Sequence, residues 1–227
     1  MKSFSNALIF FFLLSNSSLF AQVKFSAATD ISVMHNFDPQ QKFTVIGQTI
    51  LPQWHFDKKN TLYAWLLYHA NGKYENTLIA TAKSPGTQPQ TISFTNQSVM
   101  RLRQISFGFK RYIIGSYDNL ENFNFYAAGG FGVMYGNASN TFSTNIDTAL
   151  YNIQYNVSHG RGDFKRLTFD ITGGFEFPVS YEMYIYSEVR MYIPTTDYPS
   201  KYLLNNSHAP LLGSINIGIR IIFDADP

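Results

Sequence analysis

The sequence predicts an all-β protein, an eight-stranded antiparallel up-and-down transmembrane β-barrel. Three observations lead to this prediction: apolar and polar residues alternate over eight segments, short turns join the segments in pairs, and longer polar stretches separate the pairs. Such alternation gives each strand one apolar and one polar face, and short turns make paired strands antiparallel neighbours. A tilted strand crosses a bilayer in about 9 to 11 residues, a length that the segments reach or approach.

The N-terminus predicts a secretory signal peptide over residues 1–21. Lys2 makes the start positive, residues 7–14 form an almost unbroken apolar run, and Ala21 places a small residue before the expected cleavage site. This run is too short for a membrane-spanning helix, although a buried N-terminal helix is an alternative. We therefore expect an exported chain whose remainder, residues 22–227, forms one barrel domain.

Charge and cysteine content exclude several classes of protein. Without Lys2, 16 basic residues face 15 acidic ones, so no electrostatic case exists for binding nucleic acid. The absence of cysteine excludes a disulfide scaffold and a thiolate zinc site. The 21 Phe and 15 Tyr, with only 14% charged residues, fit a barrel whose strands have one apolar and one polar face. We expect no cofactor.

The first four strands are expected at residues 23–33, 43–56, 61–71 and 105–113. In the first of them, Ile31 and Val33 lie on the apolar side, opposite Lys24 and Asp30. The second and third strands carry apolar residues on both faces, so their facing stays unassigned.

The last four strands are expected at residues 123–135, 167–177, 183–193 and 211–223. The final strand alternates most regularly, because its odd positions from Leu211 to Phe223 are all apolar or glycine while Arg220 occupies the other face. Tyrosine and tryptophan near strand ends match the aromatic girdles of membrane barrels. These aromatic residues include Trp54, Tyr68, Tyr112, Tyr135, Tyr181 and Tyr192.

The lengths of the connections predict the topology. Residues 57–60, 116–122 and 178–180 form short connections, residues 35–42 an intermediate one, and residues 72–100, 136–165 and 194–210 long polar loops. Outer-membrane barrels keep short turns in the periplasm and long loops outside the cell. Both termini are therefore expected on the periplasmic side.

The polar faces of the strands are expected to line the barrel. Eight strands enclose a space just wide enough for side chains, and an isolated buried ion costs several kcal/mol or more. We therefore expect a filled interior with a hydrogen-bonded network of ion pairs, completed by tyrosines such as Tyr126, Tyr184, Tyr186 and Tyr192. The predicted network consists of Lys24, Asp30, Lys110, Asp170, Glu176, Glu188, Arg190 and Arg220.

Groups that could carry out chemistry are less distinctive. Glu188 with Asp170 or Glu176 could form a general acid and base pair, but cations share the same face and favour ion pairing. No catalytic residues and no metal site are therefore expected. The five histidines, His35, His55, His69, His159 and His208, lack metal-site spacing and are expected at exposed positions.

Two surface alternatives and one soluble alternative remain. His69 or His159 beside Asp163 could serve a lipid-modifying enzyme, and Arg161-Gly162-Asp163 is a tripeptide that some adhesins present, here expected at a loop tip. A soluble sandwich or lipocalin-like barrel would also alternate, but it would turn its apolar face inward.

The mature chain resembles the small outer-membrane β-barrel proteins of Gram-negative bacteria, the OmpX-like and OmpA transmembrane-domain-like barrels. The resemblance rests on the signal peptide, the hairpin rhythm and the final strand ending in residues 219–223. It implies a non-enzymatic monomer of the outer membrane, inserted by the barrel-assembly machinery and surrounded by membrane lipid and lipopolysaccharide. The implied role is structural or in surface interaction, with an extracellular partner that the sequence does not identify.

Two alternative functions belong to other classes. A palmitoyltransferase-like barrel enzyme acting on lipid would need a polar cluster centred on histidine at the outer rim, and a lipid A acylation assay would detect it. A narrow channel for small solutes would need a continuous lumen, which conductance across a planar bilayer would reveal.

Overall fold

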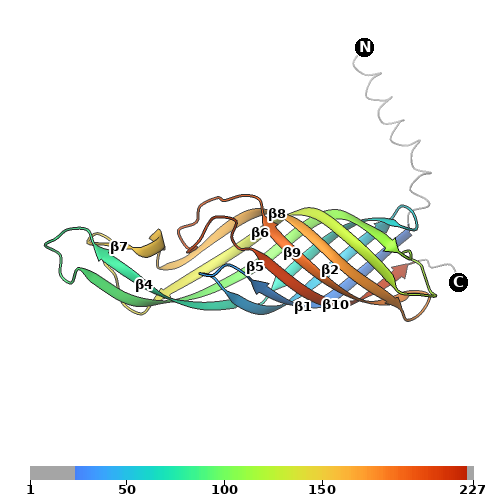
Figure 1. Cartoon of the computed structure of the whole chain (residues 1–227), viewed down its shortest axis with the longest axis horizontal. Coiled ribbons are helices and arrows are strands. Elements are labelled where there is room, and N and C mark those ends of the chain that lie inside the picture. Colours follow the sequence, from blue (N-terminus) through green and yellow to red (C-terminus); the bar gives the residue numbers. More distant parts are fainter. Residues whose placement is uncertain (1–23, 224–227) are drawn as a thin grey trace, which may run out of the picture.

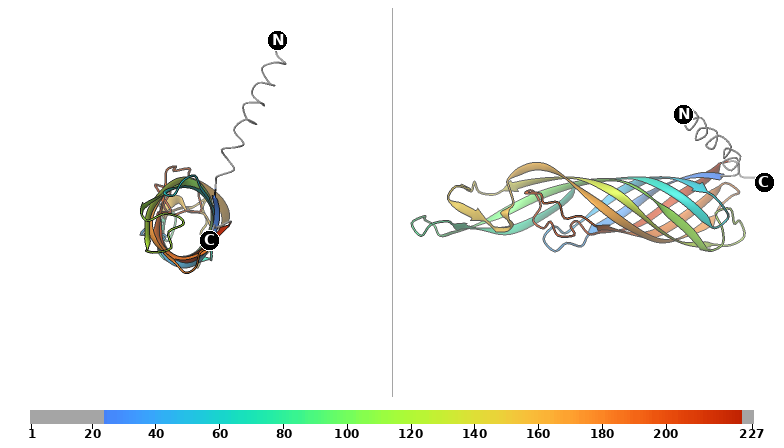
Figure 2. Two further views of the ribbon diagram at one scale, coloured as in Figure 1. Left: turned by 90° about the vertical axis from the view of Figure 1, so that its right-hand side faces the viewer. Right: turned by 90° about the horizontal axis from the view of Figure 1, so that it is seen from above.

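The computed structural model describes residues 24–223, which form a closed antiparallel barrel with a sheet extension at one end (Figure 1). Pairing of β3 with β5 and of β1 with β10 closes the ring, which is visible end-on in Figure 2. The predicted eight-stranded barrel is confirmed, whereas the signal peptide expected over residues 1–21 lies outside the described residues. The barrel strands are β1 (Lys24–Asn36), β2 (Phe43–His55), β3 (Asn60–His69), β5 (Thr91–Ile114), β6 (Asn124–Phe142), β8 (Gly160–Pro178), β9 (Met183–Pro194) and β10 (Leu212–Phe223).

Three short turns, at residues 56–59, 115–123 and 179–182, lie at one end of the barrel, which we call the turn end. β1 begins and β10 ends at this same end, where Phe25 is paired with Phe223 (Figure 1). In the first turn the Asp57 carboxylate accepts hydrogen bonds from the Asn60 side chain at 2.7 Å and from the Lys59 backbone N–H at 2.7 Å. These bonds lower the pKa of the Asp57 carboxyl below its usual value.

The opposite end, the extension end, carries strands that continue past the closed ring. β5 has 24 residues and β6 and β8 have 19 each, against 12 in β9 and in β10. Two further strands, β4 (Gly72–Ala82) and β7 (Tyr151–Ile153), pair with β5 and with β4 respectively, and the short 3-10 helix η1 (Gln154–Asn156) follows β7. Among residues 24–223 no helix has the length and apolar character to cross a membrane.

The long loops expected at residues 72–100 and 136–165 are therefore largely strands, which corrects the sequence prediction. An isolated hairpin is only marginally stable in water. These strands are stabilised because their inner faces share a small apolar core. Burial raises the pKa of Tyr74 in this core to about 12. The core residues of the extension include Tyr74, Leu78, Phe94, Ile146, Ile153 and Val157.

The outward face of the barrel carries a continuous band of exposed apolar side chains. Ile31 and Phe131 are each 68% exposed and Ile217 is 64% exposed. The facing of β2 and β3 is now defined: Ile50 and Leu66 point outward, while their neighbours Leu51 and Trp65 point inward.

Four of the six aromatic residues expected at the girdles lie on this outward surface, namely Trp54, Tyr68, Tyr135 and Tyr181. The girdle prediction is wrong for Tyr112 and Tyr192, whose side chains are buried inside the barrel. The burial of Tyr192 agrees instead with the other expectation, that it fills the interior. Both occupy inward positions near strand ends, and proximity to a strand end does not specify the face.

Candidate functional site

Seven of the eight charged residues expected to line the barrel are buried, each at most 4% exposed. They occupy alternate positions on β1, β5, β8, β9 and β10, so their side chains point into one interior. The eighth, Lys24, is partly buried at the start of β1. The seven buried residues are Asp30, Lys110, Asp170, Glu176, Glu188, Arg190 and Arg220.

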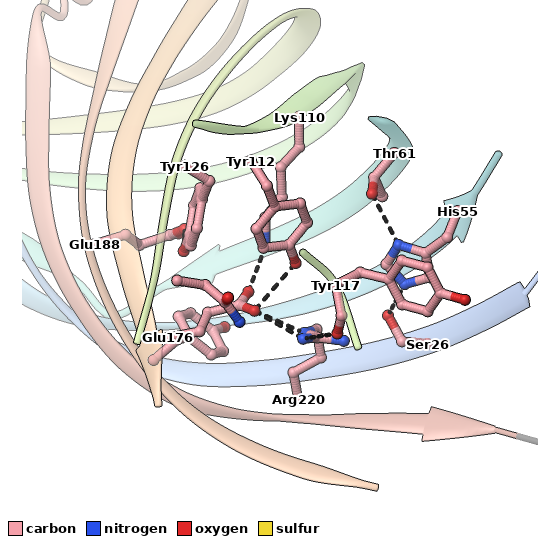
Figure 3. Close-up of polar contacts among 12 residues, drawn as sticks. Ser26, His55, Thr61, Lys110, Tyr112, Tyr117, Tyr126, Glu176, Glu188 and Arg220 are labelled. Atoms are coloured by element: carbon pink, nitrogen blue, oxygen red, sulfur yellow. Dashed lines mark hydrogen bonds and ion pairs between the residues drawn. The ribbon is translucent and has the colours of Figure 1, made fainter. Parts of the chain in front are cut away.

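Glu176 is the centre of a cluster near the turn end (Figure 3). Its carboxylate forms an ion pair with Lys110 and accepts hydrogen bonds from Arg220 Nη2 at 2.7 Å and from Arg220 Nε at 3.2 Å. The Tyr112 hydroxyl donates a further bond to it at 3.0 Å. One carboxylate on β8 thereby joins two cations from β5 and β10, and the cluster carries one more positive than negative charge.

The same cluster reaches the turn of residues 115–123. Arg220 Nη2 donates to the backbone carbonyl of Tyr117 at 2.7 Å, and the guanidinium lies 4.1 Å from the centre of the Tyr184 ring. The Tyr117 ring in turn stacks on His55 with a centroid distance of 4.2 Å (Figure 3). This turn therefore places an aromatic ring against His55 at the turn end of the barrel.

Two histidines lie inside the barrel, which corrects the expectation that histidines are exposed. His55 and His69 are each 1% exposed. The His55 ring lies 2.7 Å from Ser26 Oγ through Nε2 and 2.8 Å from Thr61 Oγ1 through Nδ1. Both histidines occupy inward positions on β2 and β3, the two strands whose facing the alternation left unassigned.

Glu188 is the centre of a second cluster. It forms an ion pair with Arg190 and accepts hydrogen bonds from the Tyr126 hydroxyl at 2.8 Å and from Asn216 Nδ2 at 2.9 Å. Lys110 Nζ lies 3.7 Å from the centre of the Tyr126 ring. Tyr126 thus contacts both clusters: its hydroxyl binds Glu188, and its ring lies against Lys110 of the Glu176 cluster.

Asp30 and Asp170 are bound differently. The Tyr186 hydroxyl donates to Asp30 at 3.0 Å, while Asp170 accepts bonds from Ser106 Oγ at 2.5 Å and from Gln104 Nε2 at 2.9 Å. Within the described part of the chain, neutral donors rather than ion pairs hold these two carboxylates. The structure therefore divides the eight predicted residues between two ion-paired clusters, two hydrogen-bonded aspartates and Lys24.

The interior toward the extension end contains a layer of apolar side chains, which the prediction of a polar lining did not include, beside buried polar residues such as Asn36 and Gln41. The segment of residues 195–211 inserts Leu203 and Leu204 here, and buried Arg166 binds this segment through the carbonyls of Tyr198 and Ala209. Alternation identifies which residues face inward but not how deep each lies, so it does not show that many of the apolar inward residues gather in one layer. The barrel residues of this apolar layer include Met34, Met100, Leu102, Met134 and Leu212.

The tripeptide of residues 161–163 does not form a loop tip. It belongs to β8, where it pairs with β6, and Arg161 Nε and the Asp163 carboxylate both bind the Asn137 side chain at 2.6 Å. His69 points into the barrel while Asp163 is exposed, so the structure does not bring these two together. The alternative partner, His159, is exposed, and its ring lies 5.4 Å from the Phe142 ring. Across residues 24–223 no three His, Asp or Glu side chains gather as a metal site.

Comparison with known proteins found no matching family model and no matching curated protein. Among solved structures, the barrel of Neisserial surface protein A superposes with a TM-score of 0.55 at 8% identity, over 88% of this chain and 97% of that one. The fold is that of the outer-membrane β-barrels. An identity this low shows a common fold alone.

Two other solved structures were also found. The attachment invasion locus protein Ail of Yersinia pestis, in complex with a heparin analogue, gives a TM-score of 0.48 at 11% identity, over 88% of this chain and 99% of that one. The N-terminal β-barrel domain of OprF from Pseudomonas aeruginosa gives 0.44 at 9% identity, over 89% of this chain and 100% of that one.

Little empty space remains between the two ion-paired clusters of this outer-membrane barrel fold. A cavity of about 10 Å³ lies there, bordered by residues such as Trp65, Lys110 and Glu188. About 10 to 15 Å³ is the minimum that one water molecule needs. The described side chains therefore fill this level of the barrel.

Proposed function

We propose that the protein is an integral outer-membrane β-barrel with a closed interior, serving a structural or surface-interaction role. The observation that supports this most strongly is the inversion of polarity, with apolar side chains outside and ions inside. Exposing the outward band to water would cost roughly 25 cal/mol for each Å² of apolar surface, a cost that lipid removes. A bilayer also tolerates a sheet only when closure pairs every edge strand, as the barrel ring does.

The turn end is proposed to face the periplasm and the extension end the cell exterior. Short turns at one end and long connections at the other follow the rule for outer-membrane barrels. Both termini then lie in the periplasm. In this proposal a monomer is inserted by the barrel-assembly machinery and is surrounded by membrane lipid and lipopolysaccharide.

The interior is proposed to stabilise the barrel rather than to catalyse or conduct. Glu176 and Glu188 are engaged by cations, and enclosed carboxylates that are already paired are poorly suited to exchange protons with a substrate. The Tyr117 ring covers His55 at the turn end, and the segment of residues 195–211 buries Leu203 and Leu204 at the extension end. This packing disfavours a channel, and the separation of His69 from Asp163 disfavours a lipid-modifying enzyme centred on His69.

The extension is proposed to present a rigid surface outside the cell. Its buried core holds β4, β7 and the long ends of β5, β6 and β8 together, so it projects as folded sheet rather than as loose loops (Figure 1). The outward side chains of β4 are mainly polar, among them Lys73, Glu75 and Thr77, as expected for a surface in water.

Cysteine labelling tests the proposed location and orientation, because the chain has no native cysteine. Ser84→Cys places a thiol in the exposed loop of the extension, and Lys59→Cys is its matched control in an exposed turn at the other end. A membrane-impermeant maleimide should label Ser84→Cys on intact cells and Lys59→Cys only after the outer membrane is permeabilised. Labelling of Lys59→Cys alone on intact cells, or recovery of both variants in the soluble fraction, would contradict the proposal.

A further inference from the structure

Four cations form a patch on the outer wall of the barrel, just beyond the apolar band at the extension end. Arg101 and Arg103 point outward from β5, and Arg161 and Lys165 point outward from β8. Asp163 is the acidic residue among them, so the patch has a net charge of +3. Arg103 pairs in register with Tyr135 of β6, which pairs in turn with Lys165, so the three lie side by side across neighbouring strands.

The patch occupies one side of the barrel. The outward positions of β9 and β10 hold no lysine or arginine, because their arginines, Arg190 and Arg220, point into the interior. Other exposed cations at this end, such as Lys42 and Lys201, lie in connecting segments rather than on strands of the barrel wall. The patch is therefore a cluster of cations on the wall itself, where an anionic ligand would find several positive charges together.

Two tyrosines hold these cations close to the wall. The Arg103 guanidinium lies 5.7 Å from the centre of the Tyr68 ring, and Lys165 Nζ lies 5.6 Å from the centre of the Tyr135 ring. Tyrosine collects at the level of lipid headgroups, and cation–π contacts restrain the long side chains. This row therefore lies at headgroup height if the band below it is in lipid.

An apolar groove of about 520 Å³ begins at the same row and runs toward the turn end on the outward face. Its far part is lined by Ile50, Leu66 and Ile105, each closer to the turn end than the cation row. A groove of this volume is within the range of small-molecule sites. Its main lining residues are Ile50, Leu66, Tyr68, Arg103, Ile105 and Tyr135.

We propose that the patch and groove together bind a phosphorylated glycolipid of the outer leaflet, with its phosphate on Arg103 and Lys165 and an acyl chain in the groove. This inference rests on the proposed function, because the groove meets the outer leaflet only if the extension end faces outward. The Arg103 guanidinium offers paired N–H donors that match phosphate oxygens, and basic pockets on membrane proteins bind anionic headgroups. The apolar groove that continues from the cations distinguishes a lipid from free phosphate.

Native mass spectrometry of the full mature barrel in mild detergent, titrated with diphosphoryl lipid A, tests the proposal. The double variant Arg103→Gln/Lys165→Gln should bind this lipid at least about tenfold more weakly, given roughly 1 kcal/mol per cation near an anionic lipid. The matched control is Arg111→Gln, which removes an outward arginine on the same strand at the turn end and should leave binding unchanged. Leu66→Trp, which fills the groove, should also weaken binding.

The ligand is varied in the same experiment. Dephosphorylated lipid A should bind the unaltered protein about as weakly as diphosphoryl lipid A binds the double variant, and inorganic phosphate should not displace the lipid. Equal loss in the double variant and in Arg111→Gln, no loss in either, or displacement by inorganic phosphate would each overturn the proposal. Cysteine labelling reports the orientation separately. If Ser84→Cys is labelled on intact cells and Lys59→Cys is not, but the double variant binds lipid as well as the unaltered protein does, this site is rejected and the proposed function stands.

Discussion

At the residue scale, the main feature is the dependence of two buried cations on one carboxylate. Glu176 alone binds Lys110 and Arg220, and Arg220 also binds the carbonyl of Tyr117 in the turn. Breaking a buried ion pair costs about 3 to 5 kcal/mol, because the remaining charge stays desolvated. Loss of the shared carboxylate should therefore be more harmful than loss of either cation.

Substitutions in the Glu176 cluster should rank in a fixed order. Arg220→Leu leaves Glu176 paired with Lys110 and should lower the free energy of unfolding by about 2 to 3 kcal/mol, whereas Glu176→Gln leaves two cations unpaired and should cost more. Arg111→Gln, on the exposed outer side of β5, should change it by less than about 0.5 kcal/mol. Equilibrium unfolding in urea in lipid vesicles measures all three. An Arg220→Leu curve equal to that of the unaltered chain, or a reversed order, would refute the proposed role of the cluster.

Alternation in the sequence was sufficient to place these charges on the inward face, but not to choose their partners. Glu176 lies between Lys110 and Arg220 because of the strand register and the tilt around the ring, neither of which is encoded locally. Asp30 and Asp170 bind tyrosine, serine and glutamine for the same reason. His55 and His69 were misplaced because apolar residues on both faces of β2 and β3 concealed which positions face inward.

At the element scale, β2 departs from the usual restriction of proline to edges and turns. Pro52 lies within the strand and pairs in register with Ala27 of β1. On the other side, β2 pairs with β3 as far as Ile50 and again from Gln53. Leu51 and Pro52 have no paired residue on β3. Because proline has no backbone N–H, it cannot donate to the ladder, and the barrel tolerates a local gap on that side.

Two adjacent glycines of β8 give an element-scale prediction. A Cβ at Gly174 would lie 2.6 Å from the Glu188 Cβ and 2.8 Å from the Ser187 carbonyl oxygen, whereas a Cβ at Gly173 would meet nothing within 4 Å. Gly174→Val should therefore destabilise the barrel by about 1 to 3 kcal/mol through overpacking, and Gly173→Val should be neutral or slightly stabilising. The gel shift between folded and heated protein, followed against temperature, compares the two variants. Equal melting of both would show that the wall is less tightly packed than the structure indicates.

The extension was the element that sequence reasoning missed. Its strands alternate, but they place polar residues outside and a few apolar residues such as Leu78 and Phe94 inside, the opposite of the barrel below. Because the prediction identifies strands by their outward apolar residues, it treats the strands of the extension as loops. The pairing of β4 with β5 became evident only from the structure.

At the scale of the whole molecule, the closed ring and the inversion of polarity belong together. Hairpin rhythm and strand count were sufficient to predict the ring, because eight alternating segments with short turns have few other ways to satisfy every strand edge. The apolar layer at the extension end was not predictable, since it depends on how the segment of residues 195–211 folds back between strands. The proposed location in the membrane depends on contact between the outward face and acyl chains.

The two native tryptophans test that claim most directly, because they lie on opposite faces of the wall. Trp54 points outward, with its ring 5.9 Å from Phe25, whereas Trp65 is 1% exposed and lies 4.7 Å from the Arg190 guanidinium. The measurement is fluorescence quenching in bilayers of brominated lipid, using Trp65→Phe to isolate Trp54 and Trp54→Phe to isolate Trp65, each checked for the folded gel shift. We predict strong quenching of Trp54 and little of Trp65. Equal quenching of both, or quenching of Trp65 alone, would contradict the account.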